Sequence, residues 1–242
     1  MAVINKQMTR HEAQLHRLLT EVLDDKYLAS NIYFKGGTAA RMLGFLDRFS
    51  VDLDFDLDEK ADKKQCRKIL YTVFDRLALT IKDESHEALQ FFLKYEAPKN
   101  ERNTIKLEIL DKVFKANRYE PQYLAPIERT SVCQTIDTMF ANKLVAPLDR
   151  YESGERIAGR DIYDIHYFFL QGYDYRKEVI EERRGVPAVE YLAELRNFID
   201  KHITRRVLDE DLNVLLDQDA FKRARKFLKP EVLNFLDQET IR

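Results

Sequence analysis

Apolar positions recur along the chain with two periods, and the periods predict the elements of its first part. Between Met8 and Leu23 the apolar residues fall on one face of a helix, at Met8, Leu15, Leu18, Leu19, Val22 and Leu23. Strict alternation over residues 50–58 predicts a strand, because successive side chains of a strand point to opposite faces. Around it we expect one further strand and two helices, at residues 31–34, 38–46 and 61–79.

The middle of the chain predicts a pair of strands. Residues 89–95 and 104–110 are rich in β-branched and aromatic residues, and the turn-forming segment Pro98-Lys99-Asn100 lies between them. We therefore expect an antiparallel pair. After Pro121 and Pro126 the pattern becomes helical and stays so, with helices expected over residues 135–149, 160–172, 187–203, 208–217, 219–228 and 230–240.

Together these elements predict an α+β fold in two parts. A small mixed β-sheet with flanking helices is expected over residues 1–125, and an all-helical C-terminal bundle over residues 126–242. The chain has 242 residues, 45% of them apolar, which is enough for an ordinary core. No internal repeat or low-complexity segment is present.

Charge and cysteine content narrow the class of protein. With 40 Lys and Arg against 42 Asp and Glu, the net charge of −2 provides no global cationic field, so any contact with a polyanion must be a local patch. The two cysteines, Cys66 and Cys133, do not suggest a disulfide framework or a zinc site. No segment resembles a secretion signal or a membrane span, and we expect a cytoplasmic protein.

Four aspartates, at positions 52, 54, 56 and 58, share one face of the strand at residues 50–58. Neighbours in this row lie ~6 to 7 Å apart, so they need a cation between them, a change of protonation or wide solvation. A row ~20 Å long cannot serve one metal centre. We expect Asp52 and Asp54 to hold the divalent ions of a nucleotidyl transfer, and Asp56 and Asp58 to be the solvated end of the strand.

Just upstream, Lys35-Gly36-Gly37-Thr38 predicts a glycine loop that opens a helix. Glycines allow the backbone to approach a ligand closely, and N–H groups at a helix start attract phosphate. A tight strand-to-helix turn needs the same residues. The acidic strand nearby favours a site for a triphosphate.

Later segments offer further candidates, each with a simpler alternative. Glu108 could supply a third carboxylate from a neighbouring strand, although Lys/Glu alternation is common on exposed sheet faces. Lys143 falls on an apolar helix stripe, three residues after Phe140, and either extends to solvent or reaches a phosphate. Asp161 and Asp164 lie at the start of a helix, where capping alone could explain both.

One family combines these features in the same order. The sequence resembles the AbiEii/AbiGii-type toxins, a branch of the polymerase-β-like nucleotidyltransferases found in type IV toxin–antitoxin and abortive-infection systems. The resemblance covers residues 30–170. It rests on four segments that are similar to the family's motifs: Lys35-Gly36-Gly37-Thr38-Ala39-Ala40 followed by Arg48-Phe49-Ser50-Val51-Asp52-Leu53-Asp54-Phe55; Ile105-Lys106-Leu107-Glu108; Lys143; and Arg160-Asp161-Ile162-Tyr163-Asp164. Ala40, where relatives often have leucine, is a minor departure that affects packing.

This resemblance implies roles for the candidate residues. Asp52 and Asp54 would bind Mg²⁺, and Lys143 would contact phosphate; Glu108, a candidate metal ligand from the strand pattern, ranks below Asp161. Asp161 would complete the active site from the helical domain, which closes the cleft, either as a partner of Lys143 or as a base for the acceptor hydroxyl. The nucleotide-binding residues would be Lys35, Gly36, Gly37, Thr38, Arg48 and Ser50. Ser50 would hydrogen-bond a phosphate or become an acceptor itself.

The expected function is transfer of a nucleoside monophosphate from an NTP to RNA, for instance the 3′ end of tRNA, by a toxin. The cationic residues available for RNA are Lys35, Arg41, Arg48, Lys143, Arg156 and Arg160. Two alternatives stay open: the same transfer to a small-molecule or protein hydroxyl, and a binding module that holds NTP without turnover. The family also implies an antitoxin encoded by a neighbouring gene, commonly one that acts on transcription.

Overall fold

The computed structural model describes residues 2–241, with side chains from residue 8 onward. These residues form two compact units. The first unit contains residues up to 113 and residues 119–134, and the second contains Phe114–Arg118 and residues from 135 onward. The chain therefore passes between the units three times, after residues 113, 118 and 134.

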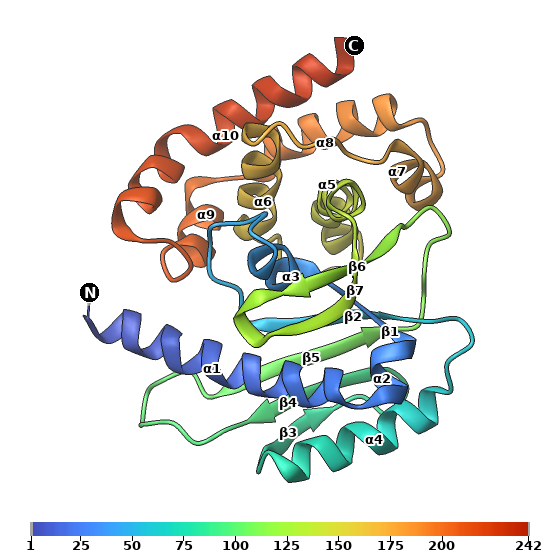
Figure 1. The fold of residues 1–242 in the computed structure, drawn as a ribbon. Helices are drawn as coiled ribbons and strands as arrows, with labels where there is room; N and C mark the ends of the chain where they lie inside the picture. The colour runs from blue at the N-terminus through green and yellow to red at the C-terminus, as the bar shows by residue number, and fades with distance from the viewer. Residues whose placement is uncertain (1, 242) are drawn as a thin grey trace. The chain divides into compact units, whose positions relative to one another are not determined.

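A mixed seven-stranded sheet forms the centre of the first unit (Figure 1). The strands are β1 (Ile32–Lys35), β2 (Asp52–Leu57), β3 (Thr80–Glu84), β4 (Leu89–Lys94), β5 (Thr104–Leu110), β6 (Tyr119–Leu124) and β7 (Arg129–Gln134). Their order is β3-β4-β5-β2-β1-β7-β6. Strand β2 lies in the middle, antiparallel to β1 and parallel to β5, and the predicted antiparallel pair is confirmed as β4 and β5.

Four helices accompany this sheet: α1 (Ala2–Asp24), α2 (Lys26–Asn31), α3 (Gly36–Met42) and α4 (Lys63–Arg76). Helices α1, α2 and α4 contact one another beside the sheet, and α3 packs on β1 and β2 (Figure 1). Helix α4 begins where Asp62 accepts hydrogen bonds from the backbone N–H groups of Lys64 and Gln65. The apolar face of β2 fixes the strand in the core, since Leu53 and Phe55 are fully buried.

The second unit is helical. Its helices are α5 (Ile136–Glu152), α6 (Gly159–Leu170), α7 (Lys177–Arg184), α8 (Ala188–His202), α9 (Arg205–Leu212) and α10 (Gln218–Ile241). Phe140 of α5 meets the rings of Phe168, Phe169 and Tyr175 edge-on, a favoured aromatic geometry. Buried Tyr191 of α8 donates a hydrogen bond of 2.9 Å to the carbonyl of Leu144. These contacts hold α5, α6 and α8 together.

The structure corrects the expected boundary near residue 125. Strands β6 and β7 and the short 3₁₀ turn Ala125–Ile127 occupy residues 119–134, where no strand was expected, and the units divide at residues 134 and 135 instead. Pro121 is tolerated because β6 is an edge strand. Helices α2 and α7 and strand β3 were also missed, and the two helices expected around Pro230 are the single helix α10. No helix within residues 2–241 is long and apolar enough to cross a membrane.

Candidate active site

Two carboxylates stand side by side near the beginning of β2. Asp52 and Asp54 are both half-buried, and the buried residues Val51, Leu53 and Phe55 alternate with them, which places the two aspartates on the same face. Burial raises the pKa of Asp54 above its ordinary value, and the charge of Asp52 raises it further. Ionising both groups therefore costs free energy, which a cation between them would offset.

The glycine loop meets this pair directly. In the β1–β2 ladder Lys35 lies opposite Asp54, and Gly36 then begins α3 with a φ of +78°. A Cβ at Gly36 would overlap the Oδ2 atom of Asp54. Both the backbone angle and the close approach therefore require glycine at this position.

Arg48 and Ser50 lie on the other side of the turn. A Cβ at Gly37 would stand 2.9 Å from the Oγ of Ser50 and 3.1 Å from an Nη of Arg48. Arg48 is buried and donates a hydrogen bond of 2.8 Å to the carbonyl of Phe49. A buried guanidinium and a hydroxyl beside a glycine N–H are groups that bind phosphate oxygens.

Thr38 contacts the acidic strand through its side chain. It is buried, and its hydroxyl donates a hydrogen bond to the backbone carbonyl of Asp52. The hydroxyl thus holds β2, and contact with a triphosphate through the Thr38 backbone N–H stays a prediction.

Asp56 is the clearest correction to the sequence analysis. Instead of forming a solvated strand end, it is 2% exposed, and its carboxylate accepts hydrogen bonds from Lys35 Nζ at 2.5 Å, Tyr119 Oη at 2.8 Å and Gln134 Nε2 at 2.7 Å. These partners come from β1, β6 and β7. Lys35, expected to bind nucleotide, is therefore paired with Asp56, while Asp58 follows the strand and accepts from the Tyr33 hydroxyl.

Glu108 lies on β5 directly opposite Asp54. Its carboxylate is bonded to Lys106 Nζ at 2.9 Å and to Gln90 Nε2 at 2.5 Å. Within residues 2–241 no three or more His, Cys, Asp or Glu side chains are grouped to hold a metal ion. Glu108 as a third ligand stays a prediction, and the donors that fit a divalent cation are the carboxylates of Asp52 and Asp54. Mg²⁺ commonly takes one or two carboxylates and completes its shell with water and phosphate oxygens.

The second unit carries a separate cluster on α5 and α6. Lys143 Nζ lies 3.3 Å from Asp161 Oδ1 and 2.9 Å from Asp164 Oδ2, and both carboxylates are buried. Arg150 Nε lies 2.8 Å from Asp161 Oδ2. Burial acts to raise the pKa of Asp161, but Lys143, Arg150 and Arg160 outweigh it and the pKa is lowered. A carboxylate held as an anion is a weak base, which favours the role of partner to Lys143.

Two members of this cluster, Arg150 and Asp164, were not among the predicted site residues, although Asp164 was noted at the start of its helix. Arg150 lies seven residues after Lys143 on α5 and Asp164 three residues after Asp161 on α6, so each shares a helix face with a predicted residue. This helical spacing is the feature of the sequence that could have indicated Arg150 and Asp164.

Most of the cations expected to meet RNA have carboxylate partners. Lys35 pairs with Asp56, Arg41 with Glu12, Lys143 with Asp161, and Arg156 with Glu210 and Asp211. Their charge is balanced locally. The structure therefore adds no support for these six residues as a cationic patch.

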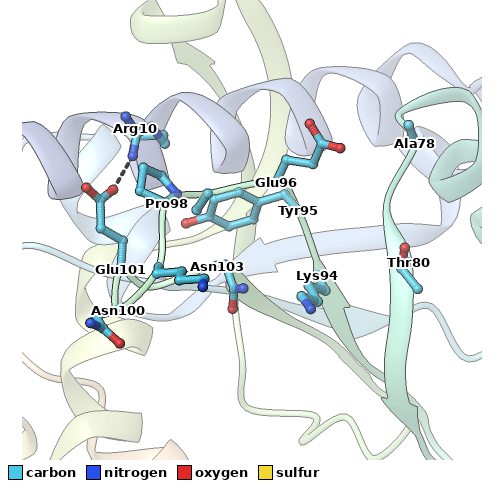
Figure 2. A pocket seen from close by; sticks show the side chains of 12 residues that line it. Arg10, Ala78, Thr80, Lys94, Tyr95, Glu96, Pro98, Asn100, Glu101 and Asn103 are labelled. Atoms are coloured by element: carbon cyan, nitrogen blue, oxygen red, sulfur yellow. Dashed lines mark hydrogen bonds and ion pairs between the residues drawn. The ribbon is translucent and has the colours of Figure 1, made fainter.

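A solvent-open cavity of about 940 Å³ lies elsewhere in the first unit (Figure 2). Arg10 of α1, residues at the ends of β3 and β4, and the loop at residues 96–103 line it. Cations and carboxylates both line its wall, where Arg10 pairs with Glu101. None of the predicted site residues belongs to this lining.

A glycine turn at the start of a helix, set against two alternating carboxylates on a strand of a mixed sheet, is the arrangement expected from the sequence for a nucleotidyltransferase. Solved structures share the fold. JHP933 from Helicobacter pylori is similar over 97% of this chain and 92% of its own, with a TM-score of 0.57 and 20% identity. MenT4, a nucleotidyltransferase toxin from Mycobacterium tuberculosis H37Rv, is similar over 96% and 84%, with a TM-score of 0.53 and 18% identity.

The family is shown by sequence. Residues 17–237 match the family described as nucleotidyl transferase AbiEii toxin, type IV TA system, and the chain belongs to this family of toxins. The protein is a nucleotidyltransferase, and membership of a toxin–antitoxin family implies an antitoxin as its partner. None of the curated proteins compared with the sequence matches it.

Proposed function

We propose that the protein transfers a nucleoside monophosphate from an NTP to a hydroxyl of RNA, with Mg²⁺ bound at Asp52 and Asp54. The observation that carries the proposal is the placement of the Asp54 carboxylate directly against Gly36, with Asp52 beside it on the same face of β2. The raised pKa of Asp54 supports the need for a cation. RNA as the acceptor rests on the family resemblance, since the cations expected to bind it are largely paired.

In this reaction the acceptor hydroxyl oxygen forms a bond to the α-phosphorus, and the bond from that phosphorus to the bridging oxygen of pyrophosphate breaks. Pyrophosphate leaves with the electron pair, and the hydroxyl proton passes to a base or to water. Bound Mg²⁺ would supply charge neutralisation of the triphosphate and activation of the hydroxyl. Asp52 and Asp54 would hold and orient the Mg²⁺.

The glycine turn would hold the triphosphate itself. Backbone N–H groups at Gly36 and Gly37, the Ser50 hydroxyl and the buried Arg48 guanidinium are donors or charges suited to phosphate oxygens. Lys143 and Asp161 are expected to serve the same reaction, as the family motifs imply. We also propose that the antitoxin is encoded by a neighbouring gene.

The test is incubation of the purified protein with labelled NTPs, MgCl₂ and total tRNA, followed by separation of RNA from protein. We expect label on RNA that EDTA abolishes and that Asp54→Asn lowers at least ~100-fold, because positioned charge at the reacting phosphate commonly contributes this much. The matched control is Asp58→Asn. Asp58 lies outside the Asp52–Asp54 pair, so this variant should retain transfer.

The outcomes separate the alternatives. Label on RNA that is indifferent to Asp54 contradicts the proposed site. Asp54-dependent label on protein or on a small molecule replaces RNA with that acceptor. A thermal shift with Mg²⁺ and NTP but no labelled product on any acceptor indicates the binding module.

A further inference from the structure

The backbone on both sides of the Asp52 Cα is held by side chains from outside the sheet. The β1–β2 register begins with Lys35 opposite Asp54, so β1 supplies no Cα partner for Asp52. There the Thr38 hydroxyl donates to the Asp52 carbonyl, and His11 of α1 contacts the preceding carbonyl, with Nε2 2.9 Å from Val51 O.

These two bonds, together with the parallel ladder in which Asp52 pairs with Lys106 of β5, restrain the direction of the Asp52 side chain. The Val51 carbonyl belongs to the planar peptide before the Asp52 Cα, and the Asp52 carbonyl to the peptide after it. Two fixed peptide planes determine φ and ψ between them, and hence where the Cα–Cβ bond points. His11 holds the first plane and Thr38 the second.

His11 is well placed to hold a carbonyl. It is 2% exposed, and because a carbonyl only accepts, Nε2 must carry the hydrogen. Burial lowers the pKa of His11, which favours the neutral ring, with Nδ1 as the acceptor atom. Nδ1 lies 2.8 Å from the hydroxyl of Tyr95, whose single proton can go either to that nitrogen or to the Arg102 carbonyl 2.7 Å away.

The second partner of His11, Tyr95, lies at the solvent-open cavity. Tyr95 follows β4 and stands in the wall of the cavity that Arg10 and Glu101 also line (Figure 2). The ring of His11 therefore joins three segments: α1, the loop entering β2, and the loop between β4 and β5. Only the bond to Val51 bears on the Asp52 backbone.

We propose that His11 is a positioning residue, whose Nε2–H bond to Val51 sets the Asp52 carboxylate in place beside Asp54 for a divalent cation. The inference rests on the proposed function, in which those two carboxylates hold Mg²⁺. It differs from a purely structural role, because a histidine that only filled the core would affect stability without affecting affinity for the metal. Outer partners of metal ligands commonly change metal affinity 10- to 100-fold when removed.

Two amide isosteres distinguish the roles. The side-chain nitrogen of Gln can stand near the position of His Nε2 and donate to Val51, whereas Asn is shorter and reaches only the position of Nδ1. Binding of Mn²⁺ to the full chain without NTP or RNA, followed by electron paramagnetic resonance, provides a readout other than activity. Thermal unfolding of each variant is measured beside it.

We expect His11→Asn to weaken Mn²⁺ binding about tenfold and His11→Gln to stay within about twofold of the wild type. Tyr95→Phe removes the other partner of His11 and should keep wild-type affinity even if it unfolds at a lower temperature. Wild-type affinity in a folded His11→Asn protein, or equal losses in all three variants, would overturn the proposal. If His11→Asn does not fold, the other two decide, since a loss of affinity in either contradicts the inference.

Asp54→Asn separates this inference from the proposed function. A wild-type protein with an Asp54-dependent Mn²⁺ site but no transfer to RNA overturns the reaction alone, and the comparison of His11 variants stands. A wild-type protein with no Asp54-dependent Mn²⁺ site overturns both.

Discussion

At the residue scale, Asp56 separates two kinds of carboxylate on one strand face. Asp52 and Asp54 are half-buried beside the glycine turn, whereas Asp56, two positions further along, is enclosed and bonded to Lys35, Tyr119 and Gln134. A buried carboxylate with a cation and two neutral donors is satisfied within the protein. Asp56 therefore belongs to the framework of the sheet.

We expect Asp56→Asn to lower the free energy of unfolding by about 3 kcal/mol, because it leaves the Lys35 ammonium without its partner in a largely buried site. Urea unfolding followed by circular dichroism measures this. The matched control is Asp111→Asn, which removes an exposed partner of Lys63 and should cost less than about 1 kcal/mol. Equal costs for the two variants would show that the Asp56 pair is not a buried one in solution.

The sequence could identify the aspartates but not their surroundings. Alternation along residues 50–58 predicted that Asp52 and Asp54 share one strand face, and the structure places Asp54 against Gly36. The partners of Asp56 are 21 to 78 positions away in sequence, and two of them lie on strands that the pattern did not predict. Partners so distant in sequence leave no periodic pattern from which they could be predicted.

At the element scale, prolines account for the main errors in the predicted fold. Strands β6 and β7 lack clear alternation, and the sequence predicts a helical pattern after Pro121 in β6 and Pro126 beyond it. An edge strand tolerates proline, since one of its sides has no ladder to complete. Strands and helices with strong periodicity, such as β2, β4, β5 and α8, were predicted within a few residues of their bounds.

Helix α10 shows the opposite error. The sequence predicted a break at Pro230, but the helix continues through it. Proline lacks the N–H that would bond four residues back and crowds the preceding turn, which costs up to about 3 kcal/mol within a helix. Pro230 is exposed, so little packing is lost by replacing it. We expect Pro230→Ala to raise the free energy of unfolding by about 1 to 3 kcal/mol in urea titrations.

Gln238→Ala, at another exposed position of the same helix, is the control and should change that free energy by less than about 0.5 kcal/mol. A Pro230→Ala protein no more stable than this control would mean that the helix already accommodates the proline at no cost.

At the scale of the whole molecule, membership of a toxin family predicts an effect on a cell. We expect induced expression of the wild type in a bacterial host to arrest growth and Asp54→Asn to relieve the arrest, because the proposed chemistry requires that carboxylate. Colony counts after induction measure the effect, with immunoblots to match protein levels. Asp58→Asn should remain as toxic as the wild type, and arrest by Asp54→Asn at equal protein level would place the toxicity outside nucleotidyl transfer.

The three passages of the chain between its units have a consequence for how such a protein can be inherited. Residues 114–118 belong to the helical unit, and the chain then returns to complete the sheet with β6 and β7. No single crossover between two related genes can therefore exchange one whole unit for another. A recombinant joined after residue 113 would take β6 and β7 from a different parent than the rest of its sheet, and one joined after residue 134 would take residues 114–118 from a different parent than the rest of its helical unit. Each unit would then contain segments that were not selected together.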